Sequence, residues 1–247
     1  MAWLERAEPL ASATGPFDRW LTPRREMSWQ SSTAAIDGPA AKLGGQPFWL
    51  DEPFWPVSRS SGEPMTFIGQ FPLPGSGVAM AYLFLSDEDG TFDPEGGENA
   101  FLIQSGGRVP SFVRGEVRRT GPALWRRGTD WFERQPVELR LDLKAPDEAA
   151  VAAFDRQVVF RDAALSGVPM EETDLPDVDC RSYVGGEPLF WQPWIPPEVG
   201  ASWRFFLQLD GAEGCGEDAF ALNFGGGTGY AFVSQDQREG RFCWDCV

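Results

Sequence analysis

Four cysteines are the residues of this chain best suited to metal or redox chemistry: Cys180, Cys215, Cys243 and Cys246. The last two form a Cys-x-x-Cys pair. Four thiolates could hold a structural zinc ion, but such sites usually consist of two close pairs and this sequence has one. A redox pair needs its first thiolate at the start of a helix, whereas Cys246 is the penultimate residue. We therefore expect reduced thiols, no metal, and Phe242, Trp244 and Cys246 on one face of a terminal strand.

The sequence contains no histidine, which limits the reactions it could catalyse. Ser-His-Asp catalysis, Cys-His catalysis and every histidine-containing metal site are excluded. Acid–base chemistry would fall to Asp and Glu, because the chain has only two lysines, Lys42 and Lys144, and three tyrosines. No nucleophile with a neighbouring base and an orienting group is visible. We therefore expect a protein that is not an enzyme and needs no cofactor.

The densest group of carboxylates lies between positions 87 and 98. Six acidic side chains occur there without a cation: Asp87, Glu88, Asp89, Asp93, Glu95 and Glu98. The segment connects two apolar stretches, so we expect an exposed loop. It could be a solvated loop without a role, a docking surface for a basic partner, or a calcium loop. Calcium is disfavoured because Phe92 occupies the position where such loops have glycine, and no helices are predicted on either side.

A second acidic cluster comprises Glu171, Glu172, Asp174, Asp177 and Asp179. It is interpreted either as a hydrated linker or as an extension of the same docking surface. The whole chain has 21 basic and 37 acidic residues, a net charge of -16, which would repel the phosphates of nucleic acid. We predict a basic protein partner that contacts both clusters, with Glu171, Glu172 and Asp174 joining the six carboxylates of the first.

Two similar segments of the chain, residues 43–49 and 184–190, each contain Gly-Gly-x-Pro, and four tryptophans lie just after these motifs: Trp49, Trp55, Trp191 and Trp194. They are interpreted as core residues; exposed indoles would instead suit sugar binding or a protein interface. Downstream of each segment an apolar stretch carries a glutamine, Gln70 or Gln208, interpreted as a structural amide with ligand binding as the alternative. The glycine-rich residues 225–229 lack the lysine of a phosphate-binding loop and are interpreted as a hairpin.

These repeated segments predict an internal duplication, about 41–143 and 180–247. Between the halves, residues 137–143 alternate apolar and polar side chains, which is typical of a half-buried strand. Residues 146–157 are predicted to form a helix because Pro146 and two acids precede an amphipathic, alanine-rich stretch. Residues 1–40 are predicted to be a helical covering segment before a domain at 41–247. The fold class is α+β, mostly antiparallel sheet with an internal pseudo-repeat and a few covering helices.

The first residues show neither a secretory signal nor a membrane-spanning stretch, so we expect a cytoplasmic protein. The Gly-Gly-x-Pro segment followed by Trp55-Pro56, the Phe-Ile-Gly-Gln-Phe strand at 67–71, the Phe-Phe-Leu-Gln-Leu strand at 205–209 and the closing Phe-Cys-Trp-Asp-Cys resemble the YwqG-like domain family of bacterial proteins. The resemblance covers roughly residues 40–247. It implies an internally repeated α+β fold without a defined catalytic residue.

Some YwqG-like proteins are similar to immunity proteins encoded beside secreted bacterial toxins, including type VI secretion effectors. Together with the charge and the missing catalytic groups, the resemblance predicts a cytoplasmic immunity protein. It would act as a monomer that occludes the active site of a cognate toxin, plausibly a basic nuclease. The alternative is a carbohydrate-binding or carbohydrate-active protein that uses tryptophan platforms and an Asp/Glu pair.

Overall fold

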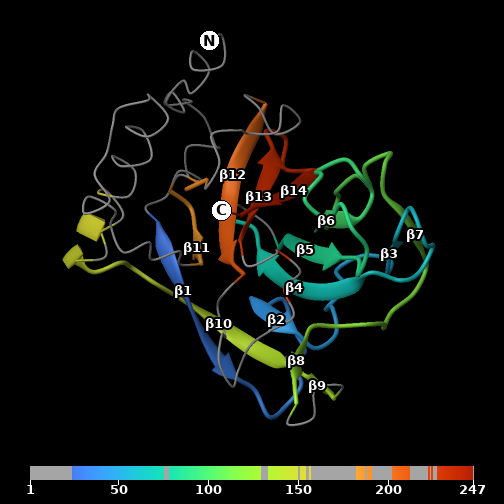
Figure 1. The fold of residues 1–247 in the computed structure, drawn as a ribbon, viewed down its shortest axis with the longest axis horizontal. Coiled ribbons are helices and arrows are strands. Elements are labelled where there is room, and N and C mark those ends of the chain that lie inside the picture. Colours follow the sequence, from blue (N-terminus) through green and yellow to red (C-terminus); the bar gives the residue numbers. More distant parts are fainter. Residues whose placement is uncertain are drawn as a thin grey trace.

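The computed structural model describes residues 24–74, 78–128, 133–149, 151–153, 156, 182–186, 188–190, 202–211, 222, 224 and 227–246. A 10-stranded sheet dominates this part of the chain and curls into a nearly closed barrel (Figure 1). Its order is β14-β13-β12-β11-β1-β10-β2-β4-β5-β6, and all neighbouring strands in it pair antiparallel. The predicted antiparallel sheet is therefore confirmed.

The strands of the large sheet are β1 (Arg25–Ser31), β2 (Lys42–Gly44), β4 (Thr66–Pro72), β5 (Met80–Leu85), β6 (Asn99–Gln104), β10 (Glu138–Lys144), β11 (Tyr183–Val184), β12 (Trp203–Asp210), β13 (Thr228–Ser234) and β14 (Gly240–Asp245). Two smaller sheets pair β3 (Trp55–Val57) with β7 (Arg114–Glu116) and β8 (Trp125–Arg127) with β9 (Arg134–Pro136).

Arginine side chains and a backbone bond join the two ends of the large sheet, β6 and β14. Just beyond β6, the Arg108 backbone N–H donates to the carbonyl of Arg238 at 2.6 Å. The Arg108 guanidinium also reaches Asp236 at 2.6 Å and Glu239 at 2.8 Å in the turn before β14. Hydrogen bonds from Arg108 and Ser234 lower the pKa of Asp236 to about 2. These contacts hold the barrel nearly closed.

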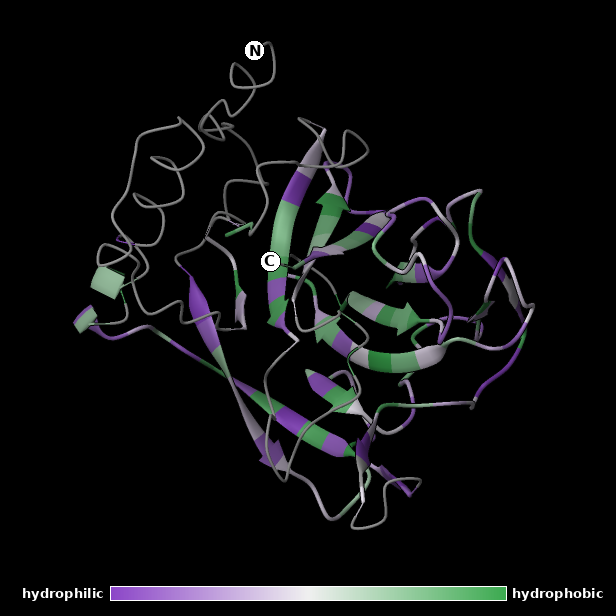
Figure 2. Cartoon of the chain, in the orientation of Figure 1, coloured by the Kyte–Doolittle hydropathy of each residue, from purple (hydrophilic) through white to green (hydrophobic). Residues whose placement is uncertain are grey.

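Apolar side chains fill the barrel and also cover its outer surface in two places. The inner core takes residues from all around the sheet, including Leu83, Leu209 and Phe242. One outer cluster surrounds Tyr82 and the other surrounds Tyr230. β5 and β13, each next to an end of the sheet, are buried on both faces and are almost continuously hydrophobic (Figure 2). The continuous apolar stretches in the sequence have this origin.

The predicted helical covering segment at 1–40 is wrong for residues 25–31, which form β1 near the middle of the sheet between β10 and β11. Met27 is buried in the inner core and Trp29 packs against it. The next residue, Gln30, is exposed, and its side chain donates to the carboxylate of Asp142. This period of two is a strand signal. The predicted domain boundary at position 41 therefore separates β1 from its own sheet. Residues 1–23 lie outside the described residues.

Two other elements match their predictions. β10 covers the alternating stretch, with Leu139 and Leu141 buried and Arg140 exposed. Among the described residues of the predicted linking helix at 146–157, residues 148–149, 151–153 and 156 are helical, whereas 146 and 147 are not. This short segment is the one helix among the described residues, so the structure there is mostly antiparallel β-sheet and does not contain the few covering helices that the sequence predicted.

The C-terminal strand β14 carries the cysteine pair. Phe242 is fully buried in the inner core and Trp244 packs against it, which confirms their predicted shared face. Cys243 points to the opposite side, into the cluster around Tyr230, and Cys246 is partly buried. Cys180 and Cys215 lie outside the described residues, so the zinc hypothesis stays untested.

Candidate functional site: an acidic loop with an exposed phenylalanine

Residues 86–98, here called the acidic loop, connect β5 to β6 as predicted. The two strands pair up to Leu85 and Asn99, and the Ser86 N–H donates to the Glu98 carbonyl at 2.9 Å. The loop contains bends and turns but no strand or helix. Backbone hydrogen bonds close two of its turns, from the Asp93 N–H to the Gly90 carbonyl at 3.1 Å and from the Gly96 N–H to the Asp93 carbonyl at 3.3 Å, and side chains hold the rest of the loop.

Asn99 and Trp244 hold the middle of the acidic loop. The Asn99 side-chain amide donates to the carbonyls of Thr91 at 2.9 Å and Asp93 at 2.8 Å. The Trp244 indole N–H of β14 donates to the hydroxyl of Thr91 at 2.9 Å. Thr91 and Pro94 are both buried. The loop is therefore anchored on both sides of its tip before any partner arrives.

Glu98 belongs to the interior and not to the exposed face of the loop. Its carboxylate accepts hydrogen bonds from the Ser58 hydroxyl at 2.7 Å and the Ser60 N–H at 2.9 Å. Burial by itself would raise the pKa of Glu98, but hydrogen bonds from Ser58, Ser86 and Ser60 outweigh it and hold the pKa below its usual range. Among the predicted partner-binding residues, Glu98 therefore stabilises the loop from inside.

Replacing Glu98 by glutamine is expected to flatten the acid side of the pH–stability profile. The folded-state pKa lies below that of the unfolded chain, so the unfolded state binds more protons as the pH falls. The stabilisation from Glu98 is complete above roughly pH 5 and is lost as the pH falls through the folded-state pKa. Urea unfolding between about pH 7 and about pH 3 should show a smaller decline in Glu98→Gln than in wild type. Glu88→Gln, an exposed control from the same loop, should decline like wild type; equal slopes in all three proteins would contradict this role.

Glu95 connects the acidic loop to β14, one end of the large sheet, through an ion pair with Arg241. The Arg241 guanidinium donates twice to one Glu95 carboxylate oxygen, at 3.1 and 3.0 Å. Arg241 is itself buried, with its guanidinium 4.6 Å from the ring centre of Phe112 and 4.5 Å from that of Trp203. Such stacked, paired arginines are held firmly. The charge of Glu95 is therefore neutralised within the molecule.

The other four carboxylates of the acidic loop are exposed to solvent. Asp87 lies 3.8 Å from the Arg134 guanidinium, a pair in which both side chains are mostly exposed. Asp93 accepts a hydrogen bond from the Glu95 N–H at 2.9 Å, within the loop itself. Glu88, Asp89 and Asp93 form no ion pair with any described residue. These three carry the charge that a partner would meet.

Phe92 stands among these carboxylates with 50% of its surface exposed. Its ring meets that of Trp244 edge-on, with 5.9 Å between the ring centres. Half of the ring is therefore supported by the barrel and the other half faces water. In the sequence, Phe92 counted only as a mismatch to a calcium loop. An aromatic residue isolated among acids was the signal that could have identified it as an anchor.

The acidic loop does not gather its carboxylates around a metal. Glu95 turns to Arg241 and Glu98 turns to the serines, although both would be ligands in a calcium loop. Within the described ranges, no group of three metal-ligating side chains was found. The loop geometry therefore favours recognition by exposed charge over calcium coordination.

The buried amide of Gln70 is a structural group, as predicted. Its nitrogen donates to the carbonyls of Gly38 at 3.0 Å and Ala40 at 2.9 Å, and its oxygen accepts from the Phe48 N–H at 2.8 Å. Next to it in the sheet, the Tyr82 hydroxyl donates to the Phe48 carbonyl at 2.8 Å. Burial raises the pKa of Tyr82, so this hydroxyl keeps its proton.

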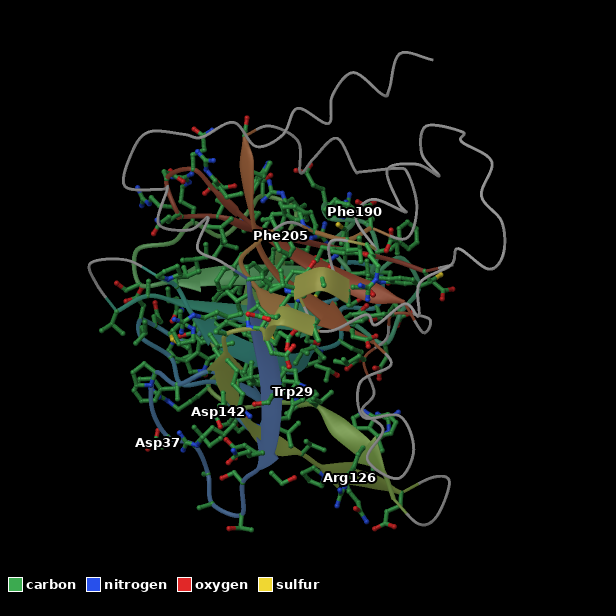
Figure 3. All side chains as sticks on the ribbon, turned by 90° about the vertical axis from the view of Figure 1, so that its left-hand side faces the viewer. Trp29, Asp37, Arg126, Asp142, Phe190 and Phe205 are labelled. Atoms are coloured by element: carbon green, nitrogen blue, oxygen red, sulfur yellow. The ribbon has the colours of Figure 1, made fainter. Side chains whose placement is uncertain are left out.

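Gln208 occupies similar surroundings on β12. Its side-chain oxygen accepts from the Leu189 N–H at 3.1 Å and from the Tyr183 hydroxyl at 2.8 Å. Opposite it, the Tyr230 hydroxyl donates to the Leu189 carbonyl at 2.8 Å. Phe190 packs against Tyr230, with the two rings tilted and 4.4 Å between their centres, and lies in the same outer cluster as Phe205 (Figure 3). Gln70 thus bonds backbone groups, and Gln208 bonds a backbone N–H and the Tyr183 hydroxyl.

The two described tryptophans after the first Gly-Gly-x-Pro segment are core residues, which confirms that interpretation. Trp55 is fully buried, and its indole N–H donates to the Met65 carbonyl at 2.8 Å. Trp49 is 9% exposed and stacks on Tyr82 with 5.1 Å between ring centres. Neither ring is available to stack on a sugar. Trp191 and Trp194 lie outside the described residues, as does the second acidic cluster with Glu171, Glu172 and Asp174.

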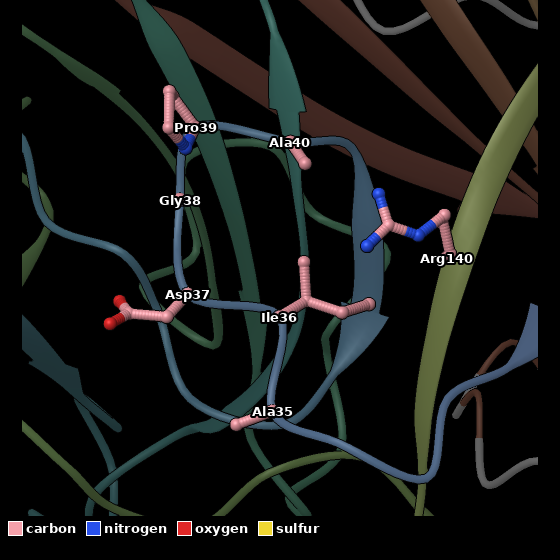
Figure 4. Close-up of a pocket in the computed structure, with 7 residues that line it drawn as sticks. All are labelled: Ala35, Ile36, Asp37, Gly38, Pro39, Ala40 and Arg140. Atoms are coloured by element: carbon pink, nitrogen blue, oxygen red, sulfur yellow. The ribbon is translucent and has the colours of Figure 1, made fainter.

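A hollow of about 400 Å³ lies between residues 35–40 and Arg140 of β10 (Figure 4). Lys42 holds the lining residue Ile36 in place: its buried ammonium group donates to the Ile36 carbonyl at 2.9 Å and to Glu138 at 2.7 Å. Its lining is alanine, proline, isoleucine and glycine apart from Asp37 and Arg140. This hollow offers a single guanidinium and no pair of groups for acid–base chemistry.

The sequence matches no known protein-family profile and no curated protein, and no solved structure matches it. None of the helices within the described residues has the length and apolar character needed to cross a bilayer. The class of protein defined by fold and site is therefore an antiparallel β-barrel-like scaffold that presents an anchored acidic loop.

Proposed function

We propose that this protein is a binding protein for a basic protein partner, and that the acidic loop is its docking surface. One observation carries the proposal: half-exposed Phe92 stands among Glu88, Asp89 and Asp93, which form no ion pair with described residues. Aromatic anchors surrounded by polar groups dominate the energetics of many protein interfaces. An anchored loop also loses little conformational freedom on binding.

The charge of the chain supports a cationic partner. With a net charge of -16, the molecule attracts basic proteins over several ångströms and repels acidic ones. The exposed carboxylates of the acidic loop would raise the rate of encounter, and burial of Phe92 would then slow dissociation. The fold needs none of these three charges for ion pairing within the described residues, which leaves them available to the partner.

The partner we propose is a secreted bacterial toxin, a basic nuclease, whose active site the acidic loop occludes. The protein would then be a cytoplasmic immunity protein against a toxin that a type VI secretion system delivers. The resemblance of residues 40–247 to YwqG-like proteins supports this reading, and the acidic loop supplies the complementary charge. Sugar binding has less support, because Trp49 and Trp55 are buried in the core.

We also infer that the barrel arose by duplication, with β1, β2, β4, β5 and β6 equivalent to β10, β11, β12, β13 and β14. Exchanging these strands leaves the order of the sheet unchanged. Register irregularities recur between Phe67 and Gly69 and between Phe205 and Leu207. Gln70 lies opposite Tyr82 as Gln208 lies opposite Tyr230. Both Gly-Gly pairs have positive φ angles.

The acidic loop differs in length from the equivalent connection in the second half. The connection between β5 and β6 takes residues 86–98, whereas the equivalent connection between β13 and β14 is the short turn 235–239. The acids of that turn, Asp236 and Glu239, are both paired with Arg108. Of these two equivalent connections, only the one between β5 and β6 is long and has carboxylates without an ion pair among the described residues. Functional residues often lie on loops that a rigid scaffold presents in this way.

Co-expression with the product of the adjacent reading frame tests the immunity function. Growth arrest by that product, relieved by this protein, together with formation of a complex between the purified proteins, is the expected result. An adjacent product that is neither toxic nor bound would remove the immunity reading.

The docking surface is tested by charge reversal in that complex. Glu88→Lys/Asp89→Lys should slow association roughly tenfold in about 20–50 mM salt, and the effect should shrink in high salt. Phe92→Ala should instead speed dissociation roughly 30-fold, equivalent to about 2 kcal/mol. Stopped-flow mixing measures both rates.

The matched control is Asp37→Lys/Glu52→Lys, which changes the net charge equally at two other exposed carboxylates. It should slow association far less. Equal slowing by both double variants would show that net charge alone acts and that the acidic loop is not the docking surface.

A further inference from the structure

Basic residues gather in one part of this acidic chain. Seven of the 21 basic residues lie between positions 108 and 134, together with only three acidic ones. They are Arg108, Arg114, Arg118, Arg119, Arg126, Arg127 and Arg134. Three of them fall within the six residues 114–119, here called the β7 edge, which includes strand β7. Figure 1 places β7 beside β3, at the far side of the barrel from β1.

The β7 edge has backbone groups available for another strand. Pro56 of β3 lies opposite Gly115 and has no N–H, so the hydrogen-bonded pairs of this ladder are Trp55 with Glu116 and Val57 with Arg114. The N–H and C=O of Gly115 therefore point away from β3. Among the described residues, no strand pairs with β7 on that side.

Val117 continues this open side. It lies two residues after Gly115, the spacing at which outward-pointing backbone groups recur along a strand. Its N–H and C=O have no backbone partner among the described residues. Its side chain is 74% exposed, the most exposed large apolar side chain of the described chain. An apolar side chain and two sets of backbone groups are thus presented together.

The arginines of the β7 edge differ in how they are held. Arg118 bonds Glu116 at 3.3 Å and the Thr120 carbonyl at 2.7 Å, and lies 6.0 Å from the ring centre of Trp55. Arg114 and Arg119 are exposed and form no ion pair with any described residue. They stay free in a chain with 37 acidic residues. Two cations without an ion pair among the described residues therefore flank Gly115 and Val117, and the carboxylate between these two residues, Glu116, is paired with Arg118.

We propose that the β7 edge binds an extended acidic segment of a partner protein by strand addition. The segment pairs its backbone with Gly115 and Val117, its carboxylates contact Arg114 and Arg119, and an apolar side chain covers Val117. Backbone pairing gives affinity and the alternating side chains give selectivity in this mode of recognition. The surface is separate from the acidic loop and takes a partner of opposite charge, so it does not depend on the proposed function.

A fluorescein-labelled peptide of alternating glutamate and valine, seven residues long, is the probe. Fluorescence anisotropy with the full chain in about 20–50 mM salt should show saturable binding. Arg114→Glu/Arg119→Glu should weaken it at least tenfold, a typical effect of losing two charge-assisted contacts. The matched control Arg25→Glu/Arg156→Glu reverses two other exposed arginines and should leave binding close to that of wild type.

A second probe isolates the backbone contribution without changing the protein. The same peptide with alternate amides N-methylated keeps its charge but cannot form a strand ladder on the methylated side, so it should bind at least tenfold more weakly. Equal binding of the two peptides, or equal weakening by both double variants, would overturn strand addition. Tighter binding of a thymidine oligonucleotide than of the peptide would also overturn it and assign the arginines to phosphate.

Discussion

Replacing Trp55 by alanine will lower the free energy of unfolding by about 3–5 kcal/mol, the usual range for a buried aromatic side chain. Trp55 is fully buried, and its ring centre lies 5.2 Å from that of Phe84 and 6.2 Å from that of Trp49. The substitution also leaves the Met65 carbonyl without its indole donor. Urea denaturation monitored by circular dichroism measures the loss.

Trp125→Ala is the control for this prediction. Trp125 is only partly buried, belongs to the small β8–β9 sheet and stacks on Arg134 at 4.5 Å, so its removal should cost no more than about 1–2 kcal/mol. Equal losses in the two variants would contradict the central packing role of Trp55. A stable Trp55→Ala protein that had lost binding to a sugar would instead favour the carbohydrate alternative.

Replacing Gln70 by leucine is expected to lower the free energy of unfolding by about 3 kcal/mol or more, because it leaves buried backbone groups without hydrogen-bond partners. The carbonyls of Gly38 and Ala40 lose their side-chain donor, and the Phe48 N–H loses its acceptor. Leucine has a similar volume, so lost hydrogen bonds and not a cavity should account for the change. The same denaturation measurement applies.

Two further glutamines calibrate this result. Gln30→Leu removes one exposed hydrogen bond to Asp142 and should change stability by no more than about 0.5 kcal/mol. If the two halves are equivalent, Gln208→Leu should lower the free energy of unfolding about as much as Gln70→Leu. It removes the acceptor of the Leu189 N–H and of the Tyr183 hydroxyl. A large loss for Gln70→Leu with none for Gln208→Leu would argue against the duplication.

Much of the sheet could be predicted from local patterns. The alternation over residues 137–143 gave β10, and the continuous apolar stretches marked strands buried on both faces. The same reasoning missed β1, where Met27 and Trp29 alternate with polar residues between β10 and β11. It was missed because the preceding residues suggested amphipathic helices. A short strand is stabilised mainly by neighbours that are distant in sequence, which no local window contains.

At the acidic loop, too, some features followed from the sequence and others were decided by the tertiary structure. Its place between two strands and its six carboxylates followed from the sequence alone. Tertiary structure decided which charges remain free: Glu98 is turned inward to Ser58, and Glu95 is paired with Arg241. It also decided that Phe92 rests on Trp244 with half its surface in water.

The physical reason lies in the range of the interactions. The turn and strand preferences that placed the loop act between residues close in the chain, so they can be read from the order of the amino acids. Ion pairing, burial and exposure depend on which distant side chains the barrel brings within a few ångströms, and Arg241 stands 146 positions from Glu95. The sequence determined that this protein has an acidic loop, and closure of the barrel determined which of its side chains can meet a partner.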